Sequence, residues 1–263
     1  MLVALRKIIV PVILSSFLLE TAATHLDFKK VAGGNFARFH HQSVDYAVFM
    51  PEHDKIRFLW QNDRGENYQT MHHALRALTN EGYQVHFLMN AGIFNQNAQP
   101  AGLWIEKKAL LRPLNRRSGK GNFHIQPNGV FYLTQEKAHI ITTVQWHNNP
   151  PKADYAVQSG PLLIIDGAIN SRLPKNHKAA YKRNAVCVDK ARRVYFVITT
   201  RYDDGTHFPN LYRFAHALQT IGCQQALYLD GSLSDFYLPM ESSRFHWQKF
   251  AGMIAVVSKR NDK

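Results

Sequence analysis

The stretch CQQALYLDGSLSDFYLP, residues 223–239, decides how this chain folds, because an apolar strand in it ends abruptly in polar residues. Residues 226–229 form a short apolar run that is typical of a buried strand. Asp230, Gly231 and Ser232 follow it at once. Asp-Gly pairs are common in turns, but a rigid strand end can also hold polar groups in a fixed geometry. The stretch therefore predicts either a plain turn or a functional site.

A second segment of the chain has the same plan as the one that leads into Asp230. In each, an amphipathic helix ends at a glycine, Gly82 or Gly222, and a strand follows that ends eight residues later, at Asn90 or Asp230. If both strands lie in one sheet and run the same way, the two side chains emerge at the same edge, where ligands of α/β sheets bind. We therefore predict that Asn90 is the counterpart of Asp230. Two unrelated helix–strand connections are the alternative.

The rest of the chain has mainly the pattern of strands. Helices are predicted over residues 67–82 and 209–222, with Pro209 in the first turn of the second. Strands are predicted over residues 44–51, 55–61, 83–89, 155–169, 184–189, 193–202 and 250–259, with only short strands and turns over 103–146. Residues 184–189 and 193–202 are expected to form a hairpin. Two principal helices in a mainly β chain predict a single-domain α+β fold with an antiparallel or mixed β-sheet core.

The first 23 residues resemble a secretory signal. Arg6 and Lys7 precede an uncharged apolar stretch over residues 8–19, and small residues follow at 21–23. The apolar stretch is shorter than the ~20 residues that cross a bilayer; an uncleaved anchor is the alternative. We predict a signal peptide over 1–23, an N-terminal lead-in over 24–39 and one domain over 40–263. The mature protein is expected to be periplasmic or secreted, with no stable membrane span.

The chain is strongly basic, with a formal net charge of +13 and an isoelectric point of about 9.8. An excess this large favours anionic partners such as nucleic acid, lipid headgroups or phosphorylated glycans; a basic surface without a specific partner is the alternative. Export makes an anionic or phosphorylated glycan the expected partner. Nucleic acid is not expected, because the aromatic residues fit a strand core and not a stacking platform.

The two cysteines, Cys187 and Cys223, lie in apolar segments that are predicted to be strands. In an oxidising compartment they could form a disulfide. A cysteine in such a segment can equally be a small buried hydrophobic residue. The sequence leaves both possibilities open.

Familiar catalytic and metal-binding motifs are absent from the sequence. It has no His-Glu-x-x-His, no paired Cys-x-x-Cys, no Gly-x-Ser-x-Gly and no Gly-x-x-x-x-Gly-Lys-Ser/Thr. RRSGKGN, residues 116–122, approaches the last motif, but Gly121 follows Lys120 where a hydroxyl is needed. We interpret this segment as a basic loop able to meet a phosphate. No ligand cluster demands a metal or cofactor, so none is predicted, although a divalent metal would suit such a site.

Polar corners that contain glycine accompany several of the predicted strands. Each alone is typical of a turn, but together they offer one carboxylate, amides, hydroxyls and two arginines, which is what an anionic sugar needs. The corners hold Asn90 and Gly92, Ser159 and Gly160, Arg183 and Asn184, Thr199, Thr200 and Arg201, and Asp230, Gly231 and Ser232.

NAGIF, GNFHIQPNGVF, QSGPLLIIDG, RNAVCV and ALYLDGS occur in the order and approximate spacing of the bacterial phosphodiester glycosidase family, which the chain resembles over roughly residues 40–258. That family shares its catalytic domain with the lysosomal uncovering enzyme, which removes N-acetylglucosamine from a phosphodiester with mannose. The resemblance implies hydrolysis on the sugar side of a sugar–phosphodiester in a glycan or phosphosugar of the cell envelope.

The resemblance also implies roles for the corner residues. Asp230 would activate water or stabilise the cationic sugar centre, while Arg183 and Arg201 would neutralise the phosphate. Substrate binding would fall to Asn90, Gly92, Ser159, Gly160, Asn184, Gly231 and Ser232. The second catalytic carboxylate stays open among Asp166, Asp203, Asp204 and Asp235.

The chain departs from the family pattern at two of these corners. Relatives usually carry Asn-Gly-Gly and Asp-Gly-Gly-Gly-Ser, whereas this chain has Asn-Ala-Gly at 90–92 and Asp-Gly-Ser-Leu-Ser at 230–234. Two other functions therefore stay open. One is a non-catalytic binder of anionic glycans, and the other is a serine hydrolase that uses Ser159 or Ser232.

Overall fold

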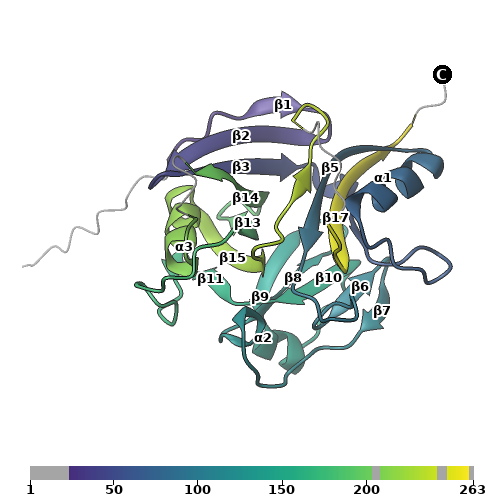
Figure 1. Cartoon of the computed structure of the whole chain (residues 1–263). Helices are drawn as coiled ribbons and strands as arrows, with labels where there is room; N and C mark the ends of the chain where they lie inside the picture. Colours follow the sequence, from purple (N-terminus) through teal and green to yellow (C-terminus); the bar gives the residue numbers. More distant parts are fainter. Residues whose placement is uncertain (1–23, 203–207, 242–247, 261–263) are drawn as a thin grey trace, which may run out of the picture.

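The computed structural model describes residues 24–202, 208–241 and 248–260. It has the predicted α+β fold, with three β-sheets in the core and two principal helices packed against them (Figure 1). Every strand pairing in these residues is antiparallel. The largest cluster of buried apolar residues takes side chains from all three sheets, among them Phe49, Phe87 and Phe131. The sheets therefore share one core.

The largest sheet has eight strands. In spatial order they are β1 (Lys29–Val31), β2 (Gly34–His41), β3 (Val44–Pro51), β14 (Val194–Tyr202), β13 (Asn184–Asp189), β15 (Cys223–Asp230), β11 (Leu162–Ile165) and β12 (Ala168–Ile169). The predicted hairpin is confirmed as β13 and β14. Residues ahead of position 40 supply β1 and most of β2, which extend this sheet at one edge.

Two smaller sheets complete the core. The four-stranded sheet has the order β16 (Phe236–Tyr237), β5 (Tyr83–Ala91), β17 (Gly252–Lys259) and β4 (Ile56–Leu59). The five-stranded sheet has the order β7 (Ala109–Arg112), β6 (Trp104–Glu106), β10 (Tyr155–Ser159), β8 (Gly129–Leu133) and β9 (Ala138–Thr142). Two short 3-10 helices, η1 (His53–Lys55) and η2 (Asn122–His124), lie between strands.

The two principal helices each pack on the sheet that receives the next strand of the chain. Helix α1 (Met71–Asn80) begins after Thr70, whose side chain accepts a hydrogen bond from the His73 backbone N–H, and it lies against β5. Helix α3 (Leu211–Thr220) lies against β11 and β15 and is capped by Asn210. Pro209 therefore precedes the cap, and the prediction that it lies in the first turn is wrong.

Residues 143–148 also correct the sequence analysis, which had only strands and turns up to residue 146. They form helix α2 (Thr143–Asn148). The Thr142 hydroxyl accepts from the Gln145 backbone N–H, and the Gln145 side chain accepts from the Thr142 backbone N–H. This capping box satisfies backbone donors at the start of the helix. A pattern of apolar residues does not reveal such local bonds.

A disulfide joins Cys187 of β13 to Cys223 of β15, which decides the question that the sequence left open. Neighbouring antiparallel strands bring the two Cα atoms to 5.6 Å. The bond ties the start of the strand that ends in Asp230 to its neighbour in the sheet. Among the described residues, no helix has the length and apolar character needed to cross a bilayer.

Candidate active site

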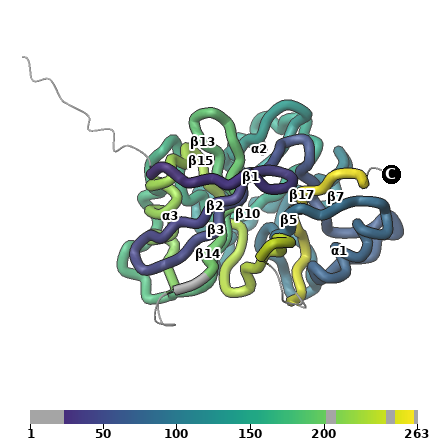
Figure 2. The backbone as a smooth tube through the Cα atoms, turned by 90° about the horizontal axis from the view of Figure 1, so that it is seen from above, coloured from purple at the N-terminus to yellow at the C-terminus, as the bar shows by residue number. Residues whose placement is uncertain are grey.

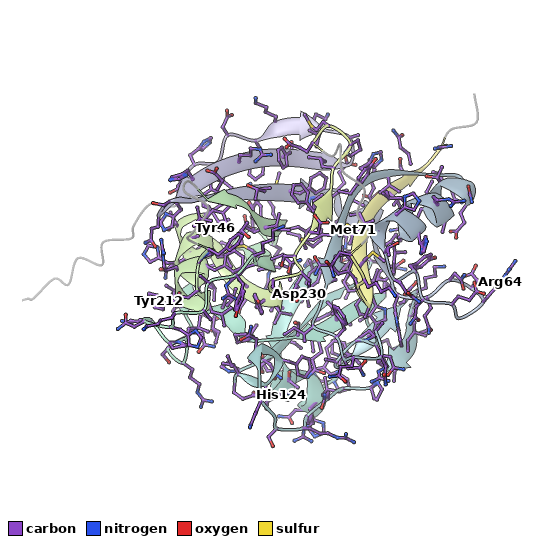
Figure 3. The ribbon with its side chains drawn as sticks, viewed as in Figure 1. Tyr46, Arg64, Met71, His124, Tyr212 and Asp230 are labelled. Atoms are coloured by element: carbon purple, nitrogen blue, oxygen red, sulfur yellow. A yellow bond between two sulfur atoms is a disulfide. The ribbon has the colours of Figure 1, made fainter. Side chains whose placement is uncertain are left out.

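Asn90 and Asp230 meet, although the strands that carry them belong to different sheets. Strand β5 lies in the four-stranded sheet and β15 in the eight-stranded sheet (Figure 1), so the condition of a shared sheet is wrong. The predicted proximity is confirmed, because Asn90 Nδ2 donates to Asp230 Oδ2 at 2.7 Å. Figure 3 shows Asp230 near the centre of the molecule. The candidate site thus lies at the junction of two sheets.

The polar residues after β15 carry the chain across this junction. Strand β15 ends at Asp230, and after residues 231–235 the chain enters β16, which pairs with β5 in the other sheet. The Ser234 hydroxyl donates to the Asp230 carbonyl at 3.2 Å, and the Asp235 N–H donates to Asn90 Oδ1 at 3.0 Å. A step between sheets leaves backbone groups outside both ladders, and these side chains satisfy some of them. The apolar strand ends in an acid at this step.

The side-chain amide of Asn184 and the backbone N–H of Asp235 fix the direction in which the Asn90 side chain faces Asp230. Asn184 Nδ2 donates to the Asn90 side-chain oxygen at 3.0 Å and to its carbonyl at 2.8 Å. Because the Asn90 Oδ1 atom also accepts from Asp235, the Asn90 NH₂ group must point at Asp230. Asn90 is 1% exposed and Asn184 is fully buried. The Asn184 Oδ1 atom is buried and has no hydrogen-bond partner within the described residues.

The Asp230 carboxyl changes its charge near neutral pH. Burial raises the pKa of Asp230 to about 6, while the Gly231 N–H at 2.7 Å and the Asn90 amide oppose that rise. A carboxyl group with such a pKa is mostly ionised at pH 7 and can still be protonated in mild acid. That is the range in which a side chain serves as a general acid or base.

Arg183 is a buried cation whose hydrogen bonds go to neutral oxygens. It is 2% exposed, and its guanidinium donates to Pro209 O at 2.7 Å, to Tyr228 Oη at 3.0 Å and to Ala179 O at 3.2 Å. No carboxylate among the described residues pairs with it. Burial lowers the pKa of Arg183, but a guanidinium remains charged in proteins. Within the described residues its positive charge is therefore not neutralised by a carboxylate.

Tyr228 is the residue that sequence analysis missed, because the apolar run around it marked it only as strand core. Its hydroxyl accepts from Arg183, and the Asn122 side chain also acts on it by lowering the pKa of the phenol. Burial raises the pKa of Tyr228 to about 12, so the phenol is neutral at pH 7. A Cβ on Gly231 would lie 2.7 Å from the hydroxyl oxygen, which requires a glycine there. The register of β15 shifts between Tyr228 and Asp230, which pair with Ala185 and Asn184 of β13, so a simple period-2 pattern would not have marked Tyr228 as part of the site.

Three of the predicted substrate-binding residues pack inside the protein. Ser159 is fully buried, and its hydroxyl donates to a β15 carbonyl at 3.2 Å. Gly92 has φ +76°, and a Cβ there would lie 2.9 Å from a methyl carbon of Val157. A Cβ on Gly160 would lie 2.6 Å from Cβ of Asn128. These contacts make the three residues part of the support beneath the site.

Three residues that the sequence analysis considered are described only in part or not at all. Arg201 lies in β14 with its backbone paired opposite β3, but its side chain falls outside the described part of the structure. Asp203 and Asp204 also lie outside the described residues. Ser232 is described and is exposed, in residues 231–235 between β15 and β16.

Of the candidate second carboxylates in the described residues, only Asp235 joins the Asp230 cluster. It does so through its backbone N–H, which donates to Asn90. Asp166 lies instead at the turn between β11 and β12, where it accepts a hydrogen bond from Gln225 at 2.6 Å. Nowhere in residues 24–202, 208–241 and 248–260 do three His, Cys, Asp or Glu side chains gather closely enough to hold a metal ion.

The sequence matches one family model and a bacterial relative. The model of a family described as phosphodiester glycosidase matches residues 83–244. That range contains Asn90, Arg183 and Asp230. The chain is also 34% identical over 212 residues to YigE of Escherichia coli (strain K12), a protein described as uncharacterized; the match covers 80% of each chain.

Comparisons of structure give the same fold at low sequence identity. The catalytic domain of zebrafish N-acetylglucosamine-1-phosphodiester alpha-N-acetylglucosaminidase matches with a TM-score of 0.60 and 14% identity, over 86% of this chain and 82% of that one. A putative exported protein of Burkholderia pseudomallei matches with a TM-score of 0.54 and 8% identity, over 85% and 74% of the two chains.

Proposed function

The chain belongs to the phosphodiester glycosidase family, and on that premise we propose that it hydrolyses a sugar–phosphodiester on the sugar side. The substrate is an anionic or phosphorylated glycan outside the cytoplasm. The observation that carries this proposal is the pairing of an ionisable acid, Asp230, with an oriented amide, Asn90, near a buried Arg183 that has no carboxylate partner within the described residues.

The reaction needs one base and one anion-binding group. Water attacks the anomeric carbon and gives its proton to the Asp230 carboxylate, which is mostly ionised at pH 7 because its pKa is about 6. The bond from the anomeric carbon to the bridging oxygen breaks, and its electron pair leaves with the phosphomonoester. A phosphomonoester leaves easily, so charge neutralisation by Arg183 matters more than protonation by an acid.

In this proposal Asn90 and Asn184 position the Asp230 carboxylate and do not only bind the substrate. Asn184 orients Asn90, and Asn90 orients the carboxylate, so both are positioning residues in this proposal. The unpartnered Asn184 Oδ1 atom is suited to accept a sugar hydroxyl. Gly231 and Ser232 border the carboxylate and contact the substrate, while Gly92, Ser159 and Gly160 support the site. Arg201 keeps its proposed role as a second phosphate contact.

The protein acts in the periplasm or outside the cell in this proposal. The signal-like residues 1–23 and the disulfide between Cys187 and Cys223 support that location, because disulfides persist in oxidising compartments. N-acetylglucosamine is the first sugar to test, since the zebrafish relative is named for a diester of that sugar.

A small panel of sugar-1-phosphate methyl diesters, assayed in ¹⁸O-labelled water, tests the proposal. We expect free sugar and phosphomonoester in equal amounts, with the label in the sugar, and we expect Asp230→Asn to abolish turnover with the fold kept. Label in the phosphate, or full activity in Asp230→Asn, would contradict the assignment.

The second candidate function is a binder of anionic glycans without catalysis. The alanine at position 91 and the Ser-Leu pair at 232–233, which replace glycines of the family pattern, favour it. A diester that binds tightly and is recovered intact after long incubation would establish this function instead. The serine hydrolase has no such support, since the Ser159 hydroxyl is buried and donates to a carbonyl, with no histidine on it among the described residues.

A further inference from the structure

Two loops of the protein carry lysine and arginine without a single acidic residue. The first, residues 113–125, follows β7 and contains Arg116, Arg117 and Lys120. The second, residues 170–183, lies between β12 and β13 and contains Arg172, Lys175, Lys178, Lys182 and Arg183. Except for Arg183, all of these side chains are exposed. No carboxylate in the described residues pairs with any of the eight, whereas elsewhere Arg193 pairs with Asp189 at 2.7 Å.

The backbone of the 113–125 loop is held in place by buried amides. The Gln158 side chain accepts from the Asn115 N–H at 2.8 Å and donates to the Asn115 carbonyl at 2.7 Å. Farther along, Asn128 Nδ2 donates to the Phe123 carbonyl at 3.1 Å. Gln158 is 1% and Asn128 is 4% exposed. The basic side chains therefore project from an ordered backbone.

The 170–183 loop is held in the same way. Asn210 Nδ2 donates to the carbonyls of Lys175 at 3.0 Å and His177 at 3.1 Å, and Arg183 Nη2 donates to the carbonyl of Ala179 at 3.2 Å. Each backbone is thus fixed at more than one point, which lowers the entropy that an anionic ligand must remove on binding.

The two loops converge on one hydroxyl next to the candidate catalytic acid. Arg183, the last residue of the second loop, donates to Tyr228 Oη, and the side chain of Asn122 in the first loop is close enough to the same group to lower its pKa. Tyr228 precedes Asp230 by two residues in β15. Figure 3 shows His124, in the first loop, below Asp230, and Tyr212, over which the Lys175 ammonium lies, to its left. Figure 2 gives the backbone from a second direction.

We propose that these two loops form a binding surface for phosphate groups beyond the bond that is cut, so that the aglycone is itself a phosphate-bearing glycan. This inference rests on the proposed function, because the substrate has an aglycone only if the protein cleaves a glycosidic bond. A single diester phosphate needs one or two cations, whereas the seven exposed cations of the two loops, none of which pairs with a carboxylate in the described residues, raise the potential over a wide area and attract a polyanion. The basic segment 116–122, which lacks the phosphate-loop pattern, thereby acquires a role.

The test compares two double variants with a control of equal charge change. Arg117→Gln/Lys120→Gln and Lys178→Gln/Lys182→Gln each remove two positive charges from one loop. Lys29→Gln/Arg64→Gln removes two from exposed positions in β1 and in the loop before α1, and Arg64 lies far from Asp230 in Figure 3. Binding of inorganic phosphate and of inorganic tripolyphosphate is measured by titration calorimetry at low and at 0.5 M salt.

We expect tripolyphosphate to bind at least about 10-fold more tightly than phosphate at low salt and to lose this advantage at high salt. Each loop variant should weaken tripolyphosphate binding by about 5- to 10-fold, and the control by less than about 2-fold. Equal affinities for the two anions, or equal losses in loop and control variants, would overturn the proposal. So would tighter loop-dependent binding of polygalacturonate or of single-stranded DNA, which would assign the loops to carboxylates or to nucleic acid.

The same titrations on Asp230→Asn separate this inference from the proposed function. If tripolyphosphate binding depends on the loops but the protein cleaves no diester, the proposed glycosidase function is wrong and the phosphate-binding surface is still supported. If the protein cleaves diesters but the loop variants bind tripolyphosphate as before and keep the same KM, the glycosidase function is supported and the phosphate-binding surface is wrong. In an active enzyme, KM for a diester with an extra phosphate on the aglycone should rise about 5-fold in each loop variant, and KM for the methyl diester should stay within about 2-fold.

Discussion

Asp230 and Glu106 are both carboxyl groups whose pKa is raised by burial, but they lie in very different surroundings. The pKa is about 6 for Asp230 and about 7 for Glu106, which is 7% exposed. Asp230 ends a strand at the junction of two sheets, where amides, a phenol and a basic loop converge. Glu106 lies in β6 and accepts hydrogen bonds from the Trp60 N–H at 3.2 Å and the Trp104 indole N–H at 3.3 Å.

The difference teaches that a raised pKa reports burial and does not by itself locate a site. Burial raises the pKa of Glu106 at least as much, yet its side-chain hydrogen-bond donor is an indole of the core. In both groups one side-chain donor and one backbone N–H oppose the rise, so the pKa values do not separate Asp230 from Glu106. The polar groups around a carboxyl group, and not its pKa, distinguish a candidate catalytic acid from a buried structural one.

The largest expected effect separates the two acids by activity. Asp230→Asn should lower kcat/KM for the preferred diester by about 10³-fold, because a positioned base contributes roughly 10²- to 10⁴-fold. Glu106→Gln should leave kcat/KM within about 3-fold of the parent protein. Steady-state kinetics at pH 7 measure both, with circular dichroism to check folding. Comparable losses in the two variants would break the comparison.

The second effect separates them by stability. A carboxyl with a folded pKa above its unfolded value loses stability as pH rises from the unfolded to the folded pKa, here from 4.5 to about 7 for Glu106. Between pH 5 and pH 8 the unfolding free energy of Glu106→Gln should therefore improve on that of the parent by roughly 2 to 3 kcal/mol. Urea unfolding at the two pH values measures this, with exposed Glu136→Gln as the control. A constant difference across the range would show that Glu106 does not titrate there.

The third effect sharpens the role of the amide next to Asp230. If ionised Asp230 is the base, activity rises with pH through about 6 and is lost below it. The Asn90 amide lowers the pKa of Asp230. Asn90→Ala should therefore raise the pH at which activity is half-maximal by about one unit and lower kcat about 10-fold at pH 7. A pH–rate profile measures both.

Asn170→Ala is the matched control for that amide. Asn170 is 4% exposed and donates to the Leu162 carbonyl at 2.8 Å. The Asn170→Ala variant should lose stability, but the rise of its activity with pH should stay near pH 6. The same shift in both variants would mean that the profile reports folding and not Asp230.

The smallest effect concerns the phenol between Arg183 and the Asp230 loop. Tyr228→Phe removes the acceptor of one Arg183 hydrogen bond, and we expect kcat/KM to fall about 5- to 10-fold. Tyr195→Phe removes a similar bond, from the hydroxyl to Asp189 at 2.9 Å, at the end of β13 opposite Asn184. That control should change stability alone, so equal losses of activity would remove Tyr228 from the site.

The sequence by itself determined the features that depend on residues a few positions apart. Apolar alternation and helical spacing predicted α1, α3 and strands such as β3, β13 and β15, and the order of motifs predicted the family. The end of β15 stood out because an acid follows its apolar run directly. Short-range signals also misled where local bonds decide the outcome, as at α2, which forms because Thr142 and Gln145 cap it.

Only the tertiary structure decided how the site is assembled. Asn90 and Asp230 are 140 positions apart and come from two sheets, and the hydrogen bond between them exists because the chain crosses from β15 to β16 beside β5. The same holds for the Tyr228 hydroxyl, which meets residues of two distant loops, and for Glu106, which two tryptophans surround. Contacts of this kind depend on how sheets pack, and packing is set by the whole buried core, which no short stretch of the sequence specifies.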